Sequence, residues 1–507
     1  MPTYLSPGVY VEELEPAARP IEGVGTAVAA FVGLAAEGPF HTPTLVTNWT
    51  QFVANFGEPV PGTFLAQSVY GYFLNGGGRA YIVRVGGSAT PREAPVARGE
   101  LPAAADARVA AYVATALTAG ASTTVEIADA AEGAPEDAFR IVVRGEGREE
   151  VFEPVTARRG RNNAVSQVNA TSTLIRLAES ATGAIADRRP ANATVTLVAA
   201  ASQEIAVRPA DYAGDSADRT GFGGLEAIAD VTMVCAPDLM AAHLAGTIDR
   251  EGVRAVQAAM IAHCEQMGDR MAILDTPPDL TPQQVHEWRT DEAGYDSKFA
   301  ALYWPWVKVF DQADGVVKAV PPSGHAAGVW ARSDSQRGVH KAPANEVVRG
   351  VIGVGTTVTR GEHDLLNPAG VNCIRAFPGR GIRIWGARTL SSDPTWRYIN
   401  VRRLYNYVES SLRGGTQWVV FEPNDKDLWE RLNRTIRSFL DRVWLDGALF
   451  GDTADQAFYV KCDDETNPSE RIEAGELVCE IGMAVVKPAE FVVFRLAQLP
   501  TGNAVTE

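Results

Sequence analysis

The chain has 507 residues, of which 46% are hydrophobic and 21% are charged, and 62 acidic against 46 basic side chains give it a formal net charge of -16. This length exceeds what one hydrophobic core usually organises, so we expect several domains, and the composition excludes a chain that is disordered throughout. The acidic balance has the wrong sign for neutralising nucleic-acid phosphates, so we expect no nucleic-acid partner.

The sequence gives no signal for secretion or for membrane insertion. No positively charged start precedes an apolar stretch with a cleavage site, and the most apolar run, residues 26–36, falls short of the about 20 residues that a membrane-spanning helix needs. The five cysteines show no CxxC spacing, which is typical of reduced thiols in a cytosolic protein. We therefore expect synthesis and assembly in the cytoplasm.

Residues 1–22 are predicted to form an arm with no core of its own. Four prolines exclude a helix there, whereas Val9, Tyr10, Val11 and Glu12 have strand character. An arm of this kind contributes its strand to another sheet.

Residues 23–87 are predicted to be the first part of an α/β core. The pattern gives a buried strand within residues 26–36, helices near residues 52–56 and 64–72, and a second strand at residues 80–85.

Residues 88–205 are predicted to form an inserted peripheral domain. This stretch has no tryptophan or cysteine and few other aromatic residues, so it buries less area per residue than the rest of the chain. Alternating apolar residues at 124–127 and 138–143 favour strands, and residues 165–177 favour a helix.

Residues 206–375 are predicted to be a core α/β domain. Strands at residues 228–234 and 270–275 flank a helix at residues 252–267, and Thr281-Pro282 opens another helix. Strands that alternate with helices of this length indicate a parallel or mixed sheet.

Residues 376–507 are predicted to be a C-terminal domain. Its best-defined helix spans residues 425–445, with Asn424 as the expected cap, and a shorter helix spans residues 401–412. Strands are expected at residues 457–462, 476–486 and 490–496. Because no helices separate these strands, we expect them to pair antiparallel or with strands from other chains.

Few residues suggest chemistry. Asp275 and Asp279 follow a strand, where α/β enzymes keep catalytic acids, but turn and helix-cap roles account for both. Ser323 and His325 lack the nucleophile motif of a hydrolase, Gly23-Val24-Gly25 precedes a strand instead of following one, and the histidines lack zinc-binding spacing. The sequence therefore predicts no catalytic, cofactor-binding or metal-binding residue.

Six stretches carry a resemblance to a known family. They are residues 6–14 (SPGVYVEEL), 300–307 (AALYWPWV), 321–345, 377–404 (FPGRGIRIWGARTLSSDPTWRYINVRRL), 421–451 and 488–498 (PAEFVVFRLAQ). In these stretches the chain resembles contractile tail sheath proteins, and the stretches follow the family's order. Residues 88–205 carry no such resemblance.

The resemblance implies a multi-domain subunit with a mixed-sheet α/β core, an inserted strand-rich outer domain and extended terminal arms. Such subunits stack in sixfold rings around an inner tube, are triggered at a baseplate, and are closed by terminator or cap proteins. It also implies that rings are linked by donated strands. The expected donors are the arm strand 9–12 and the four residues Phe491, Val492, Val493 and Phe494, and the expected acceptors are Phe458, Tyr459, Val460, Leu477 and Val478.

The helix at residues 425–445 is the expected contact to the inner tube. Sheath subunits hold their tube through a helix in this part of the chain, and in an acidic protein a cationic helix face suits docking. The contacting residues would be Arg431, Arg434, Arg437 and Arg442. A solvated charged face is the alternative.

The resemblance leaves several alternatives open. A phage tail and a phage-derived injection particle released by lysis share such a subunit. A type VI apparatus comes third, because its sheath uses two different chains, whereas this chain carries both donor and acceptor parts. From the residues alone, an α/β enzyme with an accessory domain or a different self-assembling shell protein also fits.

Overall fold

The computed structural model describes residues 20–86, 97–105, 109–117, 123–131, 133–135, 137–145, 148–158, 160–180, 189–197, 207–311 and 315–495. The chain divides into two compact units, one formed by Met1–Gly86 with Val207–Glu507 and the other by Gly87–Ala206. The second unit is therefore inserted into the first, and its boundaries lie one residue outside the expected 88 and 205. The predicted arm strand at residues 9–12 lies outside the described residues.

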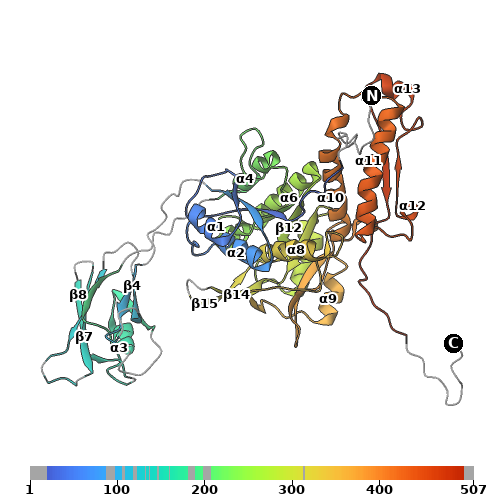
Figure 1. The fold of residues 1–507 in the computed structure, drawn as a ribbon. Coiled ribbons are helices and arrows are strands. Elements are labelled where there is room, and N and C mark those ends of the chain that lie inside the picture. Colours follow the sequence, from blue (N-terminus) through green and yellow to red (C-terminus); the bar gives the residue numbers. More distant parts are fainter. Residues whose placement is uncertain are drawn as a thin grey trace, which may run out of the picture. The chain divides into compact units, whose positions relative to one another are not determined.

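A nine-stranded sheet, counted over the described residues, forms the centre of the first unit (Figure 1). In spatial order its strands are β16 (Glu346–Val347), β19 (Gly381–Ile384), β18 (Val371–Phe377), β13 (Ala300–Trp304), β12 (Met271–Asp275), β11 (Met233–Cys235), β1 (Val28–Gly33), β3 (Arg79–Arg84) and β2 (Thr44–Val46). The strands from β18 to β3 pair in parallel, and the pairings at both edges are antiparallel. The predicted mixed-sheet α/β fold is confirmed.

Helices cover both faces of this sheet. They are α1 (Trp49–Phe56), α2 (Leu65–Asn75), α4 (Pro209–Ala213), α5 (Asp238–Leu244), α6 (Arg250–Met267), α7 (Pro282–Glu287), α8 (Ser323–Arg337) and α9 (Arg360–Leu366), with short helical turns η2 (Gly223–Ala227) and η3 (Trp288–Ala293). Every residue of β1, β12 and β13 is buried. Burial on both faces explains why these strands are continuous apolar runs in the sequence.

A smaller antiparallel sheet lies beside the large one. Within the described residues it joins β15 (Val316–Val320), β14 (Val307–Asp311) and β17 (Val351–Val354). Its central strand follows β13 after the turn at Pro305, and the inward side chains of β14 join the main core.

The inserted unit packs two antiparallel sheets around its own core. One sheet orders β10 (Ala193–Thr196), β6 (Thr123–Asp129), β7 (Ala138–Gly145) and β8 (Arg148–Thr156), and the other orders β4 (Arg98–Pro102), β5 (Ala110–Ala116) and β9 (Ile175–Glu179). The core takes side chains from both sheets and from α3 (Ala164–Thr171). The predicted helix at residues 165–177 is thus wrong in its second half, because β9 begins there.

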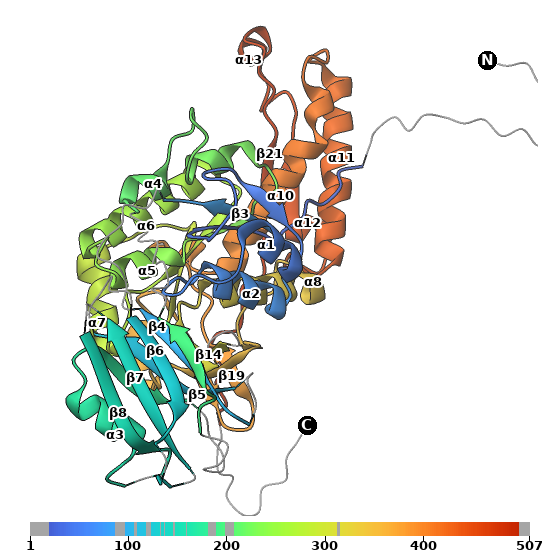
Figure 2. The ribbon, with the colours of Figure 1, turned by 90° about the vertical axis from the view of Figure 1, so that its left-hand side faces the viewer.

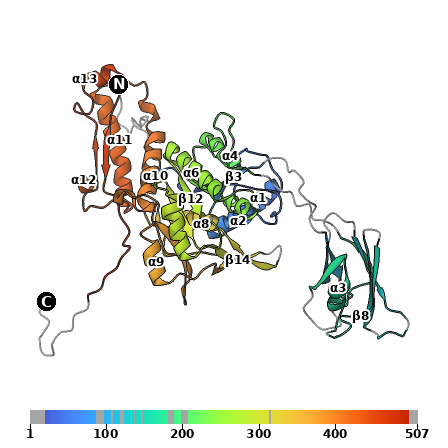
Figure 3. The ribbon, with the colours of Figure 1, turned by 180° about the vertical axis from the view of Figure 1, so that it is seen from behind.

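The C-terminal part of the first unit contains two long helices and a strand pair. Its elements are η4 (Pro394–Trp396), α10 (Ile399–Gly415), η5 (Gln417–Val419), α11 (Lys426–Leu445), α12 (Ala454–Ala457), β20 (Phe458–Lys461), α13 (Ser469–Glu473) and β21 (Glu480–Met483). Figures 1 and 3 show α11 between α10 and the β20–β21 pair, and Figure 2 shows α10 and α11 running side by side. The two helices and the strands share one apolar cluster.

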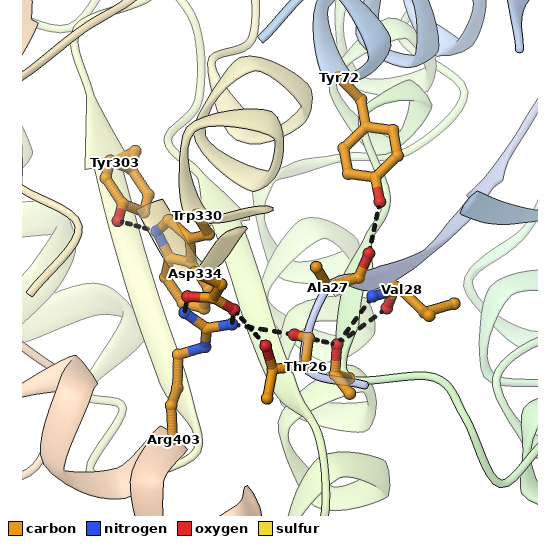
Figure 4. Close-up of polar contacts among 9 residues, drawn as sticks. Thr26, Ala27, Val28, Tyr72, Tyr303, Trp330, Asp334 and Arg403 are labelled. Atoms are coloured by element: carbon orange, nitrogen blue, oxygen red, sulfur yellow. Dashed lines mark hydrogen bonds and ion pairs between the residues drawn. The ribbon is translucent and has the colours of Figure 1, made fainter. Parts of the chain in front are cut away.

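A buried ion pair connects α10 to the central sheet (Figure 4). The Arg403 guanidinium donates to the Asp334 carboxylate of α8 at 2.8 Å and to the Thr26 carbonyl oxygen before β1 at 3.0 Å. The Thr26 hydroxyl also donates to Asp334 at 2.7 Å. Arg403 lies 4.8 Å from the centre of the Trp330 ring, whose indole nitrogen donates to Tyr303. Because both charged side chains are buried, this contact fixes α10 against the core.

Three further predictions need correction. Asp425, not Asn424, caps α11 by accepting a bond from the Leu428 amide at 2.9 Å, and Asn424 accepts from the Trp429 indole instead. The strand expected at residues 476–486 is limited to β21. No described strand pairs with the segment expected at residues 490–496, of which residues 490–495 are described.

Candidate assembly surfaces

The α11 helix has one apolar face that packs into the C-terminal cluster. Its buried residues recur at helical spacing: Leu428, Trp429, Leu432, Thr435, Ile436, Phe439, Leu440 and Val443. Burying large side chains on one face stabilises a helix far more than helix propensity does. The remaining face is free to carry charge.

The four predicted tube-contacting arginines of α11 occupy different surroundings. Arg434 and Arg437 are exposed, and Arg437 lies 3.7 Å from Asp455. Arg431 is half-buried, with its guanidinium 4.8 Å from the centre of the Trp418 ring. Arg442 donates to the Ile21 carbonyl oxygen at 2.6 Å. Three of the four side chains, those of Arg431, Arg437 and Arg442, therefore have contacts inside the subunit, and the Arg434 side chain projects from it.

The exposed face of α11 carries both signs of charge. Glu430 is exposed and Asp441 is half-buried, and both lie on the side of the helix opposite the apolar face, as do Arg434 and Arg437. A partner of this face therefore meets alternating charges and not a uniform cationic stripe.

The β20–β21 pair is an incomplete sheet. Tyr459 pairs with Gly482 and Lys461 pairs with Glu480 in an antiparallel ladder, and no further described strand joins either outer edge. The Ala484 amide donates to the Ala457 carbonyl oxygen at 2.8 Å. Because hydrogen-bonded and non-hydrogen-bonded pairs alternate along an antiparallel ladder, Tyr459–Gly482 and Lys461–Glu480 are then the hydrogen-bonded pairs.

The alternation leaves backbone groups on both outer edges. The carbonyl of Phe458 and the amide and carbonyl of Val460 point away from β21, and those of Ile481 and Met483 point away from β20. The Phe458 amide is not free, because it donates to the Ala454 carbonyl oxygen of α12. Free backbone groups of this kind template the addition of another strand. Of the predicted acceptor residues, Phe458, Tyr459 and Val460 lie in β20. Leu477 and Val478 precede β21, outside any strand.

The predicted donor at the C-terminus is extended and exposed. The exposed fractions of Phe491, Val492, Val493 and Phe494 are 74%, 69%, 76% and 85%. Four consecutive apolar side chains in water carry a hydrophobic cost that burial on a partner would remove. Figures 1 and 3 show this segment leaving the subunit below α11.

The carboxylate considered for catalysis has a structural role. Asp275 accepts bonds from the Ser323 amide at 2.8 Å and the Ser323 hydroxyl at 2.6 Å, at the start of α8. Burial raises the pKa of Asp275 to about 7, although both bonds from Ser323 act to lower it. The helix that follows β12 is capped by Thr281. Asp275 therefore caps a helix, as the helix-cap interpretation expects. The helix is α8, which begins 48 residues later in the sequence.

Two family models match the chain. The phage tail sheath protein central domain matches residues 218–390, and the phage tail sheath C-terminal domain matches residues 391–498. Together they cover more than half of the sequence. The chain belongs to the phage tail sheath family.

Similar proteins match this sheath chain along almost its whole length. The tail sheath protein of Burkholderia phage BcepMu is 26% identical over 502 residues, covering 95% of this chain and 94% of that protein. A chain of the anti-feeding prophage helical sheath in the contracted state superposes with a TM-score of 0.60 at 24% identity, covering 98% and 100%. A chain of the sixfold-symmetrised anti-feeding prophage baseplate gives a TM-score of 0.57 at 24% identity, covering 98% and 99%. The two structural matches show the same fold.

The two family models meet between the strands of the central sheet that follow residue 218 and the helix pair α10–α11. The central model ends before α10, and the C-terminal model includes α11, the β20–β21 pair and the exposed segment at residues 491–494. The inserted unit lies outside both models. None of the described helices is long and apolar enough to cross a membrane.

Sequence reasoning missed the side chains that join distant segments of this sheath subunit. Arg403 and Asp334 are 69 residues apart, and Arg388 and Glu490 are 102 residues apart. No local spacing indicates such pairs. Their only signal in the sequence is that each belongs to a stretch that resembles the family.

Proposed function

We propose that this chain is the structural subunit of a contractile sheath, which polymerises around an inner tube and contracts to drive the tube through a target envelope. The observation that carries the proposal is the alignment with the BcepMu tail sheath protein, which spans 95% of this chain and 94% of that protein. The similarity to a sheath chain in a contracted assembly supports the contractile part.

Neighbouring copies of the chain are linked by donated strands. The segment at residues 491–494 and the N-terminal arm at residues 9–12 are the donors, and the outer edges of β20 and β21 are the acceptors. The exposure of the first donor and the free backbone groups at both edges support this arrangement. A strand held by main-chain hydrogen bonds on an extended tether lets subunits rotate without separating.

The exposed face of α11 contacts the inner tube, chiefly through Arg434 and Arg437. Arg431 and Arg442 assist by holding the helix in place through Trp418 and the Ile21 carbonyl oxygen. The rings are sixfold and bind a baseplate at one end and a terminator or cap protein at the other. The likeness to a chain of a sixfold-symmetrised baseplate supports the sixfold rings and the contact with a baseplate. The particle assembles in the cytoplasm and acts as a virion tail or a released injection particle.

Negative-stain microscopy of the purified full-length chain tests this function. We expect striated hollow cylinders with a central channel. Discrete small particles would favour an α/β enzyme with an accessory domain, and closed shells would favour a different self-assembling protein; either result contradicts the proposal.

Removal of residues 1–15 tests the N-terminal donor. The truncated chain should fold with an unchanged melting temperature and fail to polymerise, as measured by light scattering, because the arm's strand serves a neighbour. Cylinders at normal yield would exclude this arm as an essential donor.

A further inference from the structure

The last described part of the chain is held to the central domain at one residue, Glu490. Arg388 binds its carboxylate through two nitrogens, Nε to Oε1 at 2.9 Å and Nη2 to Oε2 at 2.7 Å. Asn367 donates its side-chain amide to Oε1 at 2.7 Å, and the Tyr398 hydroxyl donates to Oε2 at 2.9 Å. Paired Arg–carboxylate bonds of this geometry are among the stronger and more directional contacts in proteins.

The partners of Glu490 are themselves fixed in the folded core. Arg388 exchanges backbone bonds with the Asn372 side chain at 2.7 and 2.8 Å, and Asn372 is fully buried in β18. Arg388 also donates to the Asn367 carbonyl oxygen at 3.3 Å. Glu490 is thus bound to a rigid point of the central domain, although it belongs to the C-terminal segment.

The contacts on either side of Glu490 show what this attachment does. The preceding fixed point is Val486, whose carbonyl oxygen accepts from the Asn400 side chain at 3.0 Å and whose amide donates to Ala448 at 3.2 Å. Beyond Glu490, the side chains from Phe491 to Arg495 are exposed. The free segment therefore starts at Phe491 because Glu490 is bound.

We propose that Glu490 is the anchor that sets where the C-terminal segment leaves the subunit, and therefore how far its donated strand reaches. This inference rests on the proposed exchange of that strand between copies. Release of Glu490 would move the start of the free segment back to Lys487. Four more extended residues add up to about 14 Å of reach.

The anchor has a mechanical consequence for a sheath. A tether of defined length limits the separations and rotations that linked subunits can adopt, whereas a longer tether permits many. Glu490 acts as a positioning residue, because it need not contact the neighbouring copy itself.

The first test uses the full-length chain kept monomeric by low concentration. One spin label is placed at Phe491→Cys and a second at Ser438→Cys on the exposed face of α11, in a Cys479→Ser background, and their distance distribution is measured by pulsed electron resonance. We expect Glu490→Gln and Arg388→Lys to broaden the distribution at least twofold. The matched control Glu476→Gln removes the same charge from an exposed side chain and should leave the width unchanged.

Thermal unfolding separates anchoring from general stability. We expect Glu490→Gln to change the melting temperature of the monomer little, because the loss is confined to the end of the chain. An unchanged distance distribution overturns the anchor, and so does a broadening that appears only together with a large fall in the melting temperature.

The second test uses the assembled protein without spin labels. Glu490→Gln retains the donor residues, so we expect polymers whose axial repeat varies at least twofold more widely than in the unsubstituted protein, as measured by electron microscopy. An axial repeat as uniform as that of the unsubstituted protein would contradict the proposal that Glu490 sets how far the donated strand reaches. If the unsubstituted chain forms no cylinders, the proposed function fails, while the distance measurement still decides whether Glu490 anchors the segment.

Discussion

The central sheet and the β20–β21 pair differ in how far they are complete. In the central sheet, β1, β12 and β13 are buried on both faces, and short antiparallel strands finish the two edges. The C-terminal pair has free groups on both outer edges, and Tyr459 in β20 is 55% exposed. The first region satisfies its backbone and apolar groups within the described chain, and the second leaves part of its own unsatisfied among the described residues.

This difference predicts that changes in one region affect the stability of the monomer and changes in the other affect assembly. Substitutions in the central sheet and in its link to α10 should change the free energy of unfolding of the monomer. Changes in the C-terminal strands or the exposed segment should leave the monomer folded and change polymerisation.

Removal of the exposed C-terminal segment should have the largest effect on assembly. A chain that ends at Glu490 loses Phe491 to Phe494, whose burial on a neighbour is worth about 1.5 to 3 kcal/mol for each large apolar side chain. We expect no cylinders by light scattering and microscopy, with the melting temperature of the monomer unchanged.

A chain that ends at Gln498 is the matched control for this truncation. It keeps the whole predicted donor at residues 490–496 and should polymerise at normal yield. Cylinders formed by the shorter chain would show that the β20–β21 edges do not depend on this segment.

Loss of the Arg403–Asp334 pair should have the largest effect on stability. Arg403→Leu leaves Asp334 as an unpaired buried charge, which costs about 3 to 5 kcal/mol. Urea unfolding followed by tryptophan fluorescence measures the loss. Arg413→Leu, at an exposed position of α10, is the control and should change the free energy by less than about 0.5 kcal/mol. Equal effects of the two substitutions would contradict a specific role for the pair.

Replacement of Asp275 by Asn should stabilise the central sheet at alkaline pH. Burial raises the pKa of Asp275 to about 7 in the folded chain, from an ordinary value of 3.8. A raised pKa favours the folded state at low pH, and this contribution is lost as the pH rises through about 7. Asn cannot ionise and can still bond both groups of Ser323. The contribution is complete only below pH 3.8, so we expect a gain on the order of 4 kcal/mol at pH 8 and a smaller gain at pH 5.

The pH dependence of the melting temperature checks this prediction. The slope between pH 5 and pH 8 should be shallower in Asp275→Asn than in the unsubstituted chain. Part of it should remain, because burial also raises the pKa of Asp238 to about 6. The exposed Asp279→Asn serves as the control and should leave the slope as it is. A loss of stability at pH 8 would show that the ionised carboxylate is needed to cap α8.

The sequence predicted the regions where one chain satisfies its own contacts. The apolar run at residues 26–36 contains β1, and the periodicity at residues 425–445 gives α11 within one residue, because burial on both faces of a strand or one face of a helix leaves a periodic signal. The cap of α11 was placed one residue early, since Asn424 and Asp425 are both favourable caps. The short strands β2 and β17 were missed because a few residues carry little periodicity.

Contacts between distant segments and between chains could not be predicted in the same way. The arginines of α11 follow one periodic pattern, but Arg431 contacts Trp418 outside the helix, and Arg442 is held by Ile21, which is remote in the sequence. The segment at residues 490–496 reads as a strand, yet its described part pairs with no described strand of its own chain. A strand pattern without a partner among the described strands is what a donated strand would leave in a sequence.

The smallest expected effect on the monomer comes from the exposed face of α11. Charge reversal in Arg434→Glu/Arg437→Glu changes exposed side chains whose ion pairs are worth about 0 to 1 kcal/mol each, so the free energy of unfolding should hardly change. Repeated around each ring, the lost contacts should weaken attachment to the inner tube. The expected particles are sheath polymerised without tube or sheath that contracts early, scored by microscopy.

Salt and a matched variant decide whether this defect is electrostatic. The difference in tube attachment between this variant and the unsubstituted protein should shrink as salt rises, because salt screens both the lost attraction and the repulsion that the new carboxylates introduce. Arg442→Gln, which removes the bond to the Ile21 carbonyl oxygen, should instead lower the melting temperature with a weaker effect on tube attachment. Tube-filled extended particles at normal yield from the double charge reversal would show that this face of α11 is solvated. The tube would then bind another part of the subunit. The assembly role of the C-terminal part would in that case depend only on the β20–β21 pair and the exposed segment at residues 491–494.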